Sequence, residues 1–202
     1  MRSKIGDTIA RNAVSRLRET DEYKLWHKIC YSPPRNPELL AREFDIEVVY
    51  YPGFSRPGAE ALKYFNNDGW KLFLRLQDSE KTQRFAAAHG IVHYILHRHM
   101  PQLLSNGRMD WRAETQANAG AGLMLIEEEI FGLLAHANGI SPYSICRQSD
   151  WQKPHITHFL QATQEVFGVN KDVVFWSLFD LGYARRSSLE SAAVPEDDLL
   201  PF

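Results

Sequence analysis

A long helical segment that carries regularly spaced histidines constrains the fold of this chain more than any other feature. Residues 79–99 read SEKTQRFAAAHGIVHYILHRH. Apolar side chains recur there every three or four positions, which is the periodicity of a helix with one face against a core. Asp78 or Ser79 can cap the start of this helix, and Pro101 ends its register. The segment therefore predicts a long core-facing helix.

Two histidines on this helix have the spacing of metal ligands. His89 and His93 lie four residues apart, so their rings project from the same side of a helix, one turn apart. Two imidazoles placed in this way can bind one tetrahedral zinc ion, although two unrelated histidines at the edge of a core would show the same spacing. His97 continues the row, but eight residues rise about 12 Å along the axis. We therefore expect His97 to be a partly buried residue beside the site.

A third ligand is offered by the next predicted helix, which Asp110 can cap and which runs to about residue 125. In zinc hydrolases the third protein ligand commonly follows later in the chain. Glu114 lies near the start of this helix, and an antiparallel return would bring it beside the two histidines. Asn118 is one turn further on, where its amide could reach the site or support the backbone. A solvated helix carboxylate is the alternative interpretation of Glu114.

Taken together, these residues resemble the ImmA/IrrE family of zinc metallopeptidases. Members carry R-F-x-x-A-H-E-x-x-H-x-x-L-H and then E-x-x-A-N in the next helix. The matching residues here are Arg84-Phe85, Ala88-His89, His93, Leu96-His97, Glu114 and Ala117-Asn118. The resemblance covers about residues 35–185, and it includes the strand KLFLRL at the place of the family's active-site edge strand.

The resemblance implies a zinc site and a protein target. His89, His93 and Glu114 would bind Zn²⁺, with His97 and Asn118 beside the site. Family members typically cleave or inactivate helix-turn-helix repressors in phage, mobile-element or stress regulation. A transcriptional regulator is therefore the expected partner of this chain, either as a substrate or as a ligand.

The chain departs from the family pattern at the residue that matters most for hydrolysis. Gly90 stands where H-E-x-x-H has its glutamate, the general base that accepts a proton from water. Such a base is worth about 10²–10⁴-fold in rate, whereas the metal ligands do not depend on it. We expect zinc to be bound and peptide hydrolysis to be nearly lost. The sequence leaves open whether this glycine is natural or introduced.

Two further departures from the family pattern, Gly120 for an aromatic residue and Glu127 for a proline, concern the shape of the substrate cleft.

The last third of the chain predicts two short helices, HITHFLQATQEVFG and NKDVVFWSLFDLG, in a helix-turn-helix outline. The second helix is apolar on all sides, which is unlike a recognition helix exposed in a DNA groove. We therefore expect a packed helical subdomain or a partner surface, with DNA contact as the less favoured alternative.

The strand signals predict a small sheet. IEVVYY at residues 46–51 is rich in β-branched and aromatic residues, and Asn67-Asp68-Gly69 forms the turn of a hairpin that continues into Trp70–Leu76. The predicted fold is α+β and mostly helical. A small antiparallel sheet would pack on the zinc-binding helix, as in zincin-like proteins. Residues 1–139 would form the metallopeptidase-like core, residues 140–186 the C-terminal helical subdomain, and residues 187–202 an acidic tail.

The composition is that of an ordinary globular protein. The net charge is −2 over 202 residues, which calls for neither nucleic acid nor an anionic membrane. No signal peptide is apparent, and no apolar run approaches the ~20 residues of a membrane span, so a cytoplasmic protein is expected. Three functions remain open. They are a zinc metallopeptidase impaired by Gly90, a non-catalytic binding protein that holds a regulator or toxin, and a DNA-binding regulator with a degenerate zinc site.

Overall fold

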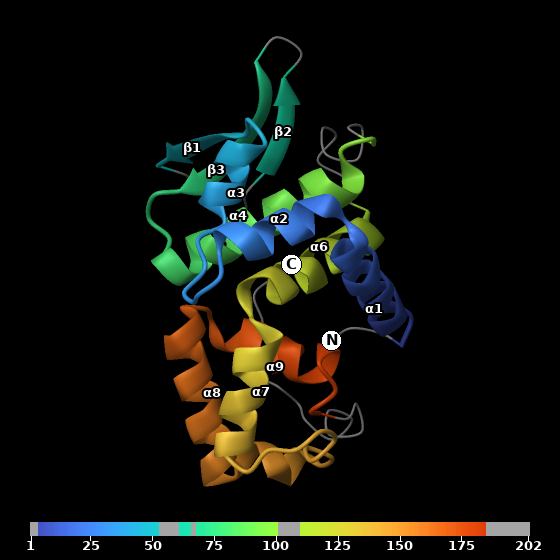
Figure 1. The fold of residues 1–202 in the computed structure, drawn as a ribbon, viewed down its shortest axis with the longest axis vertical. Coiled ribbons are helices and arrows are strands. Elements are labelled where there is room, and N and C mark those ends of the chain that lie inside the picture. Colours follow the sequence, from blue (N-terminus) through green and yellow to red (C-terminus); the bar gives the residue numbers. More distant parts are fainter. Residues whose placement is uncertain (1–3, 53–60, 66–67, 101–109, 185–202) are drawn as a thin grey trace. The chain divides into compact units, whose positions relative to one another are not determined.

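The computed structural model describes residues 4–52, 61–65, 68–100 and 110–184, and its packing divides the chain into two compact units, Met1–Leu125 and Ile126–Phe202 (Figure 1). The helix after residue 125 therefore groups with the C-terminal helices, whereas the sequence analysis places the boundary at residue 139. The predicted acidic tail, residues 187–202, lies outside the described residues. Among the described helices, none combines the length and the apolar character that a membrane span requires.

The first unit is a helical assembly with one small sheet. Its elements are α1 (Lys4–Glu19), α2 (Asp21–Ile29), α3 (Glu38–Glu43), β1 (Glu47–Tyr51), β2 (Ala61–Phe65), β3 (Gly69–Arg75), α4 (Glu80–His97) and α6 (Trp111–Leu125). Helix α6 packs against α1 on one side and α4 on another, while the sheet covers α4 through β2 and β3. The predicted α+β class, mostly helical with a small sheet, is confirmed.

The sheet is mixed rather than wholly antiparallel. Its order is β1-β3-β2, with β2 antiparallel to β3 as the hairpin signal predicts. Strand β1, however, runs parallel to β3, with Val48 opposite Leu72. The hairpin pattern fixes only the pairing of consecutive strands, and nothing in the strand periodicity says which free edge β1 joins. Strand β3, which contains KLFLRL, is consequently the central strand, so its predicted place at an edge is wrong.

Helix α4 is buried on almost every side. Ser79 caps it as predicted, because its Oγ accepts a hydrogen bond from the Thr82 N–H. Ten of its residues are buried, from Ala86 to His97. The sequence analysis expects one face of this helix against a core, whereas the structure buries residues around most of it. Small side chains such as Ala86, Ala87 and Ala88 give this helix little amphipathic signal, and they let neighbouring elements approach it closely.

Helix α6 is fixed at both ends. At its start, Asp110 Oδ1 accepts a hydrogen bond from the Arg112 N–H at 3.0 Å, which is the predicted cap. Near its end, the Met124 carbonyl accepts hydrogen bonds from Trp26 Nε1 at 2.9 Å and from Arg35 Nη1 at 3.1 Å. Arg35 is 1% exposed, and its positive charge suits the negative end of a helix dipole. These contacts set where α6 lies, and hence where Glu114 lies.

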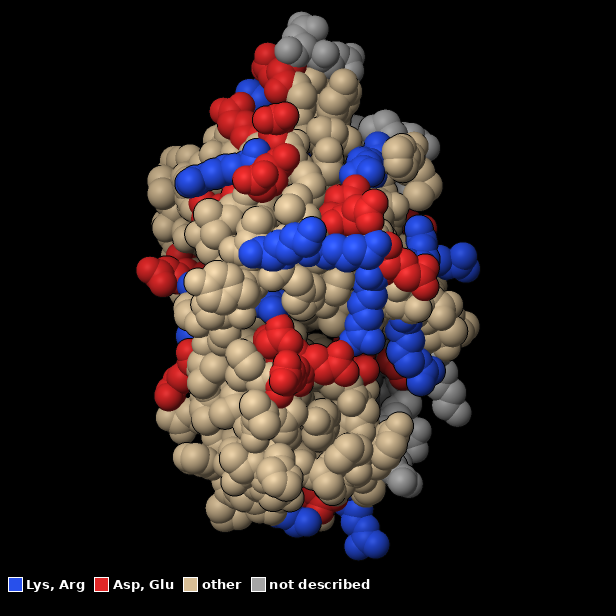
Figure 2. Space-filling model, in the orientation of Figure 1, with Lys and Arg blue, Asp and Glu red and all other residues tan. Residues whose placement is uncertain are grey.

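The second unit is helical. It contains α7 (Glu128–Ala137), the short helix η1 (Gln148–Gln152), α8 (Pro154–Phe167) and α9 (Lys171–Asp180). Gly139 and Gly168 follow α7 and α8 with positive φ angles, which is why glycine suits these helix ends. The ring of Phe131 packs edge-on against Phe159 and Tyr183. On the face that Figure 2 shows, the surface over α7 and α8 is mostly uncharged.

Candidate metal centre

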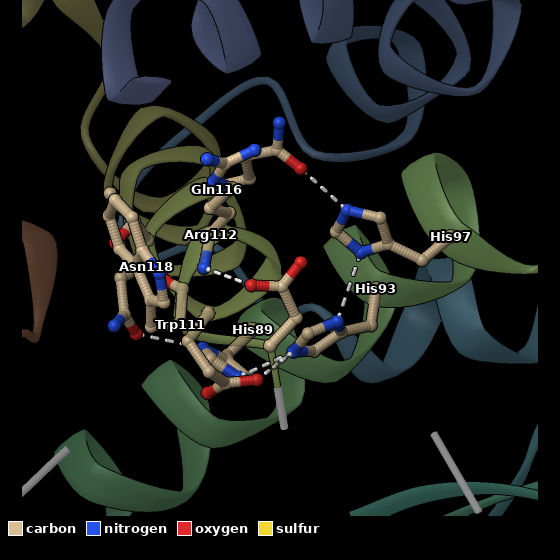
Figure 3. A network of polar contacts seen from close by, with 10 residues as sticks. His89, His93, His97, Trp111, Arg112, Gln116 and Asn118 are labelled. Carbon is tan, nitrogen blue, oxygen red and sulfur yellow. Dashed lines mark hydrogen bonds and ion pairs between the residues drawn. The ribbon is translucent and has the colours of Figure 1, made fainter. Parts of the chain in front are cut away.

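Three potential ligands from two helices converge in the first unit. Helix α4 supplies His89 and His93, and α6 supplies Glu114 (Figure 3). The two Nε2 atoms lie 3.0 Å apart. Glu114 Oε2 lies 3.4 Å from His89 Nε2, and Glu114 Oε1 lies 2.9 Å from His93 Nε2. The structure thus brings together the three residues that the sequence singles out.

These separations match the edges of a zinc coordination polyhedron. With Zn–ligand bonds of about 2.0–2.1 Å at tetrahedral angles, neighbouring ligand atoms stand roughly 3.3 Å apart. The three separations lie within about half an ångström of that value, with each of the two carboxylate oxygens facing one histidine.

One carboxylate oxygen at the site is orphaned. Glu114 Oε1 is buried, and among the described residues it has no hydrogen-bond donor. His93 Nε2 is close enough at 2.9 Å, but the direction of the contact is wrong for a hydrogen bond. A buried carboxylate oxygen without a donor costs free energy unless a cation compensates it. The donor set of two imidazoles and one carboxylate therefore fits a divalent metal.

The electrostatics favour the metal-binding protonation states. Burial raises the pKa of Glu114, but its close contacts with His89 and His93 outweigh this and lower it to about 2. Burial lowers the pKa of His93 to about 4, with Glu114 opposing the shift. At neutral pH, Glu114 is thus ionised and His93 is neutral. Both are the forms that coordinate metals.

An amide on α6 orients the first ligand. Asn118 Oδ1 lies 2.9 Å from His89 Nδ1, so the carbonyl oxygen accepts a hydrogen bond from that ring nitrogen. A neutral imidazole with its proton on Nδ1 has a free electron pair on Nε2, which is the atom that faces Glu114. Asn118 thus lies where the sequence analysis expects it.

His97 is more deeply placed than expected. It is 2% exposed, and its Nδ1 lies 3.0 Å from His93 Nδ1. Its Nε2 lies 2.7 Å from Gln116 Oε1 on α6. Burial lowers the pKa of His97, partly opposed by the hydrogen bond to Gln116, and the nearby charge of Arg16 lowers it further. His97 therefore contacts a ligand histidine without itself facing Glu114.

The comparison with protein families decides the relationship of the chain. The model of the IrrE N-terminal-like domain matches residues 41–142, which is half of the chain and contains all three candidate ligands. The chain belongs to the IrrE N-terminal-like domain family. A comparison with curated proteins finds no match. Membership supports a metal-dependent peptidase ancestry for the site, and the region matched includes the whole of α4 and α6.

In this IrrE N-terminal-like chain, the space next to Gly90 is occupied. A Cβ atom at position 90 would lie 2.4 Å from Leu72 Cδ1 on β3, far inside normal contact. Leu72 is fully buried, and Leu62 lies next to it at 3.9 Å from the same point. A glutamate side chain could begin from position 90 only if the Leu72 Cδ1 methyl group shifted within the core.

Sequence reasoning missed two residues beside the site, Leu72 and Gln116. Gln116 is two positions after Glu114, and a rotation of about 100° per residue would turn it away from the ligands. Its long side chain nevertheless reaches His97. Leu72 reads as an ordinary apolar strand residue, and only the packing of β3 on α4 reveals its contact with Gly90. No signal in the sequence could have identified either contact.

Proposed function

We propose that this chain binds a zinc ion through His89, His93 and Glu114 and acts on a regulator protein by binding it, with peptide hydrolysis lost or severely impaired. The observation that carries the proposal is the combination of three converging ligand atoms with a glycine, backed by Leu72, at the position of the general base. A zinc ion held by these residues would supply Lewis acidity at the site.

The residues of the chain account for the expected loss of hydrolysis. Gly90 has no group that accepts a proton, and the buried Leu72 side chain fills the space beside it. The loss of a general base is worth about 10²–10⁴-fold in rate. Glu114 cannot replace it, because both of its oxygens face the histidine ligands at 3.4 Å or less. The fit of Leu72 against the glycine supports a chain adapted to glycine at this position.

The proposed partner follows from the family rather than from the surface. The family resemblance favours a transcriptional regulator, such as a helix-turn-helix repressor, over DNA. Zinc, rather than another divalent metal, is favoured by the His₂Glu donor set.

The test is a paired measurement of zinc content and peptide cleavage. Zinc is quantified in the purified chain and in His89→Ala, and cleavage of quenched-fluorescence peptides is followed for the chain, Gly90→Glu and Gly90→Glu/Leu72→Ala. We expect about one zinc per chain, its loss in His89→Ala, and no cleavage by the unaltered chain. Cleavage should appear in the double variant, where the carboxylate has room.

Two results would contradict the proposal. Zinc content no higher than in His89→Ala would remove the metal site. Cleavage by the unaltered chain at the rate of the double variant would show that Gly90 does not impair hydrolysis. If the unaltered chain and both Gly90→Glu variants bind zinc and none of them cleaves a peptide, the chain is a binding protein alone.

A further inference from the structure

A chain of buried contacts links α6 to the second ligand histidine. Gln116 Oε1 lies 2.7 Å from His97 Nε2, and His97 Nδ1 lies 3.0 Å from His93 Nδ1. His93 Nε2 then faces Glu114 and His89. Figure 3 shows this series of contacts running from Gln116 through His97 to His93. His97 and His93 are 2% and 3% exposed, so water does not compete for these contacts.

With the Gln116 amide oriented so that its oxygen faces His97, counting protons along this chain gives a single arrangement. An amide oxygen cannot donate, so His97 Nε2 must carry the proton in its contact with Gln116. A neutral imidazole has one N–H, so His97 Nδ1 is then an acceptor. The proton between the two Nδ1 atoms therefore belongs to His93. His93 Nε2 is left with a free electron pair directed at the metal centre.

We infer that Gln116, acting through His97, fixes the tautomer of His93 that presents a free Nε2 to a metal ion. This inference rests on the proposed metal site for its functional meaning. Gln116 and His97 are positioning residues, because neither faces the ion position. Asn118 does the same for His89 in one step, through its Oδ1 at 2.9 Å.

One helix therefore supplies both a ligand and the orientation of the other two ligands. Glu114, Gln116 and Asn118 all lie on α6 within five residues. Removing the residue that a metal-ligand histidine hydrogen-bonds commonly costs about 10- to 100-fold in metal affinity.

The competing arrangement has the protons of both rings on the opposite nitrogens. In it, the Gln116 amide is turned to donate to His97, His97 carries its proton on Nδ1, and His93 Nε2–H points at Glu114.

Nitrogen-15 NMR of the metal-free full-length chain distinguishes these arrangements directly. We expect protonated Nδ1 and bare Nε2 for His93, with the opposite assignment for His97. Gln116→Met, which keeps the length of the side chain but removes the oxygen, should change the tautomer populations of both rings. Thr115→Ala, which leaves the Gln116 amide in place on the same helix, should preserve them.

Zinc affinity provides the second measurement, by competition with a chromophoric chelator. Gln116→Met should bind zinc about 10- to 100-fold more weakly, whereas Thr115→Ala should retain the affinity. Thermal unfolding of both metal-free variants serves as the control for a purely structural effect, and we expect their midpoints to be similar.

The outcomes separate this inference from the proposed function. A His97 ring protonated on Nδ1 in the unaltered chain would overturn the inference even if zinc binds. Unchanged tautomers and unchanged zinc affinity in Gln116→Met would overturn it as well. If the chain binds no zinc but shows the expected tautomers, the metal proposal fails and the assignment of Gln116 and His97 stands.

Discussion

At the scale of single residues, Gly90 is matched to Leu72 more closely than a chance substitution would require. Alanine in place of glycine normally stabilises a helix interior by about 1 kcal/mol. Here a Cβ at position 90 would approach Leu72 Cδ1 to 2.4 Å. The Leu72 methyl group, at the end of a buried side chain, must therefore shift before any side chain can begin from this position.

A double-mutant cycle measures this match. Gly90→Ala should be more favourable in a Leu72→Ala background than in the unaltered chain, by about 1 kcal/mol or more, because the truncated side chain removes the overlap. Urea unfolding of the four proteins gives the coupling. Ala87→Gly, at a buried position one turn before Gly90, serves as a reference for helix propensity. Additive effects of the two substitutions would contradict the steric match.

The three candidate ligands that the structure brings together could be predicted from sequence, but the residues that contact them could not. His89, His93 and Glu114 follow from helical spacing and from the order of two helices, because ligand geometry repeats with the helix period. Leu72 and Gln116 act through contacts between elements, and the period of one helix contains no information about them. The burial of His97 was underestimated for the same reason, since α6 covers it from outside its own helix.

At the scale of elements, the metal centre depends on how closely α4 and α6 can approach. The facing surfaces are rich in Ala and Gly, which shortens the distance at which two helices pack. Gly120 is the extreme case, because a Cβ there would lie 2.6 Å and 2.9 Å from the two Val92 methyl carbons and 3.1 Å from Leu17 Cδ2. Val92 is β-branched and cannot rotate away easily. The departure from the family's aromatic residue at this position therefore has a packing reason.

Gly120→Ala should destabilise the first unit by about 1–3 kcal/mol despite the better helix propensity of alanine, because the helices must separate. It should also weaken zinc binding, since Glu114 moves with α6. Thr115→Ala, on an exposed part of the same helix, is the matched control and should be neutral or slightly stabilising. Chemical unfolding and chelator competition measure the two effects. Equal behaviour of the two variants would show that Gly120 is not required for the close approach.

The helices and strands could be predicted from the sequence where local residues mark their ends. Ser79 and Asp110 cap helix starts as the sequence analysis predicts, and Gly139 and Gly168 follow α7 and α8 with positive φ angles. The parallel pairing of β1 with β3 has no such signal, because it joins strands that are not consecutive. The buried Arg35 near the end of α6 is equally non-local.

At the scale of the whole molecule, the two units contain titratable groups that respond to acid in different ranges. In the first unit, burial lowers the pKa of His93 to about 4, from 6.5. In the second, a hydrogen bond from Lys153, together with the backbone N–H groups of Cys146 and Arg147, lowers the pKa of Asp150 to about 2, from 3.8. Both groups bind protons more readily in the unfolded chain, so both lose stabilisation as the pH falls.

The difference in range predicts an order of acid unfolding in the metal-free chain. The contribution of His93 is complete above pH 6.5 and is lost as the pH falls towards 4, with a magnitude on the order of 3 kcal/mol. Burial lowers the pKa of His97 as well, so it loses stabilisation in the same direction. The contribution of Asp150 is complete above pH 3.8 and is lost towards 2. Because the half-exposed Lys153 is screened by solvent, this contribution is smaller, about 1–2 kcal/mol. The first unit should therefore weaken at a higher pH than the second.

Amide hydrogen exchange, corrected for its intrinsic pH dependence, measures the two units separately in the presence of a chelator. Between neutral pH and about pH 5, protection should fall in α4 and α6 while α8 and α9 keep theirs. His93→Gln should remove much of this early loss, because the side chain no longer titrates. Asp150→Asn should leave the early loss unchanged and should weaken α8 already at neutral pH. Earlier loss of protection in α8 and α9 than in α4 would reverse the predicted order, and it would mean that buried histidines do not limit the acid stability of the first unit.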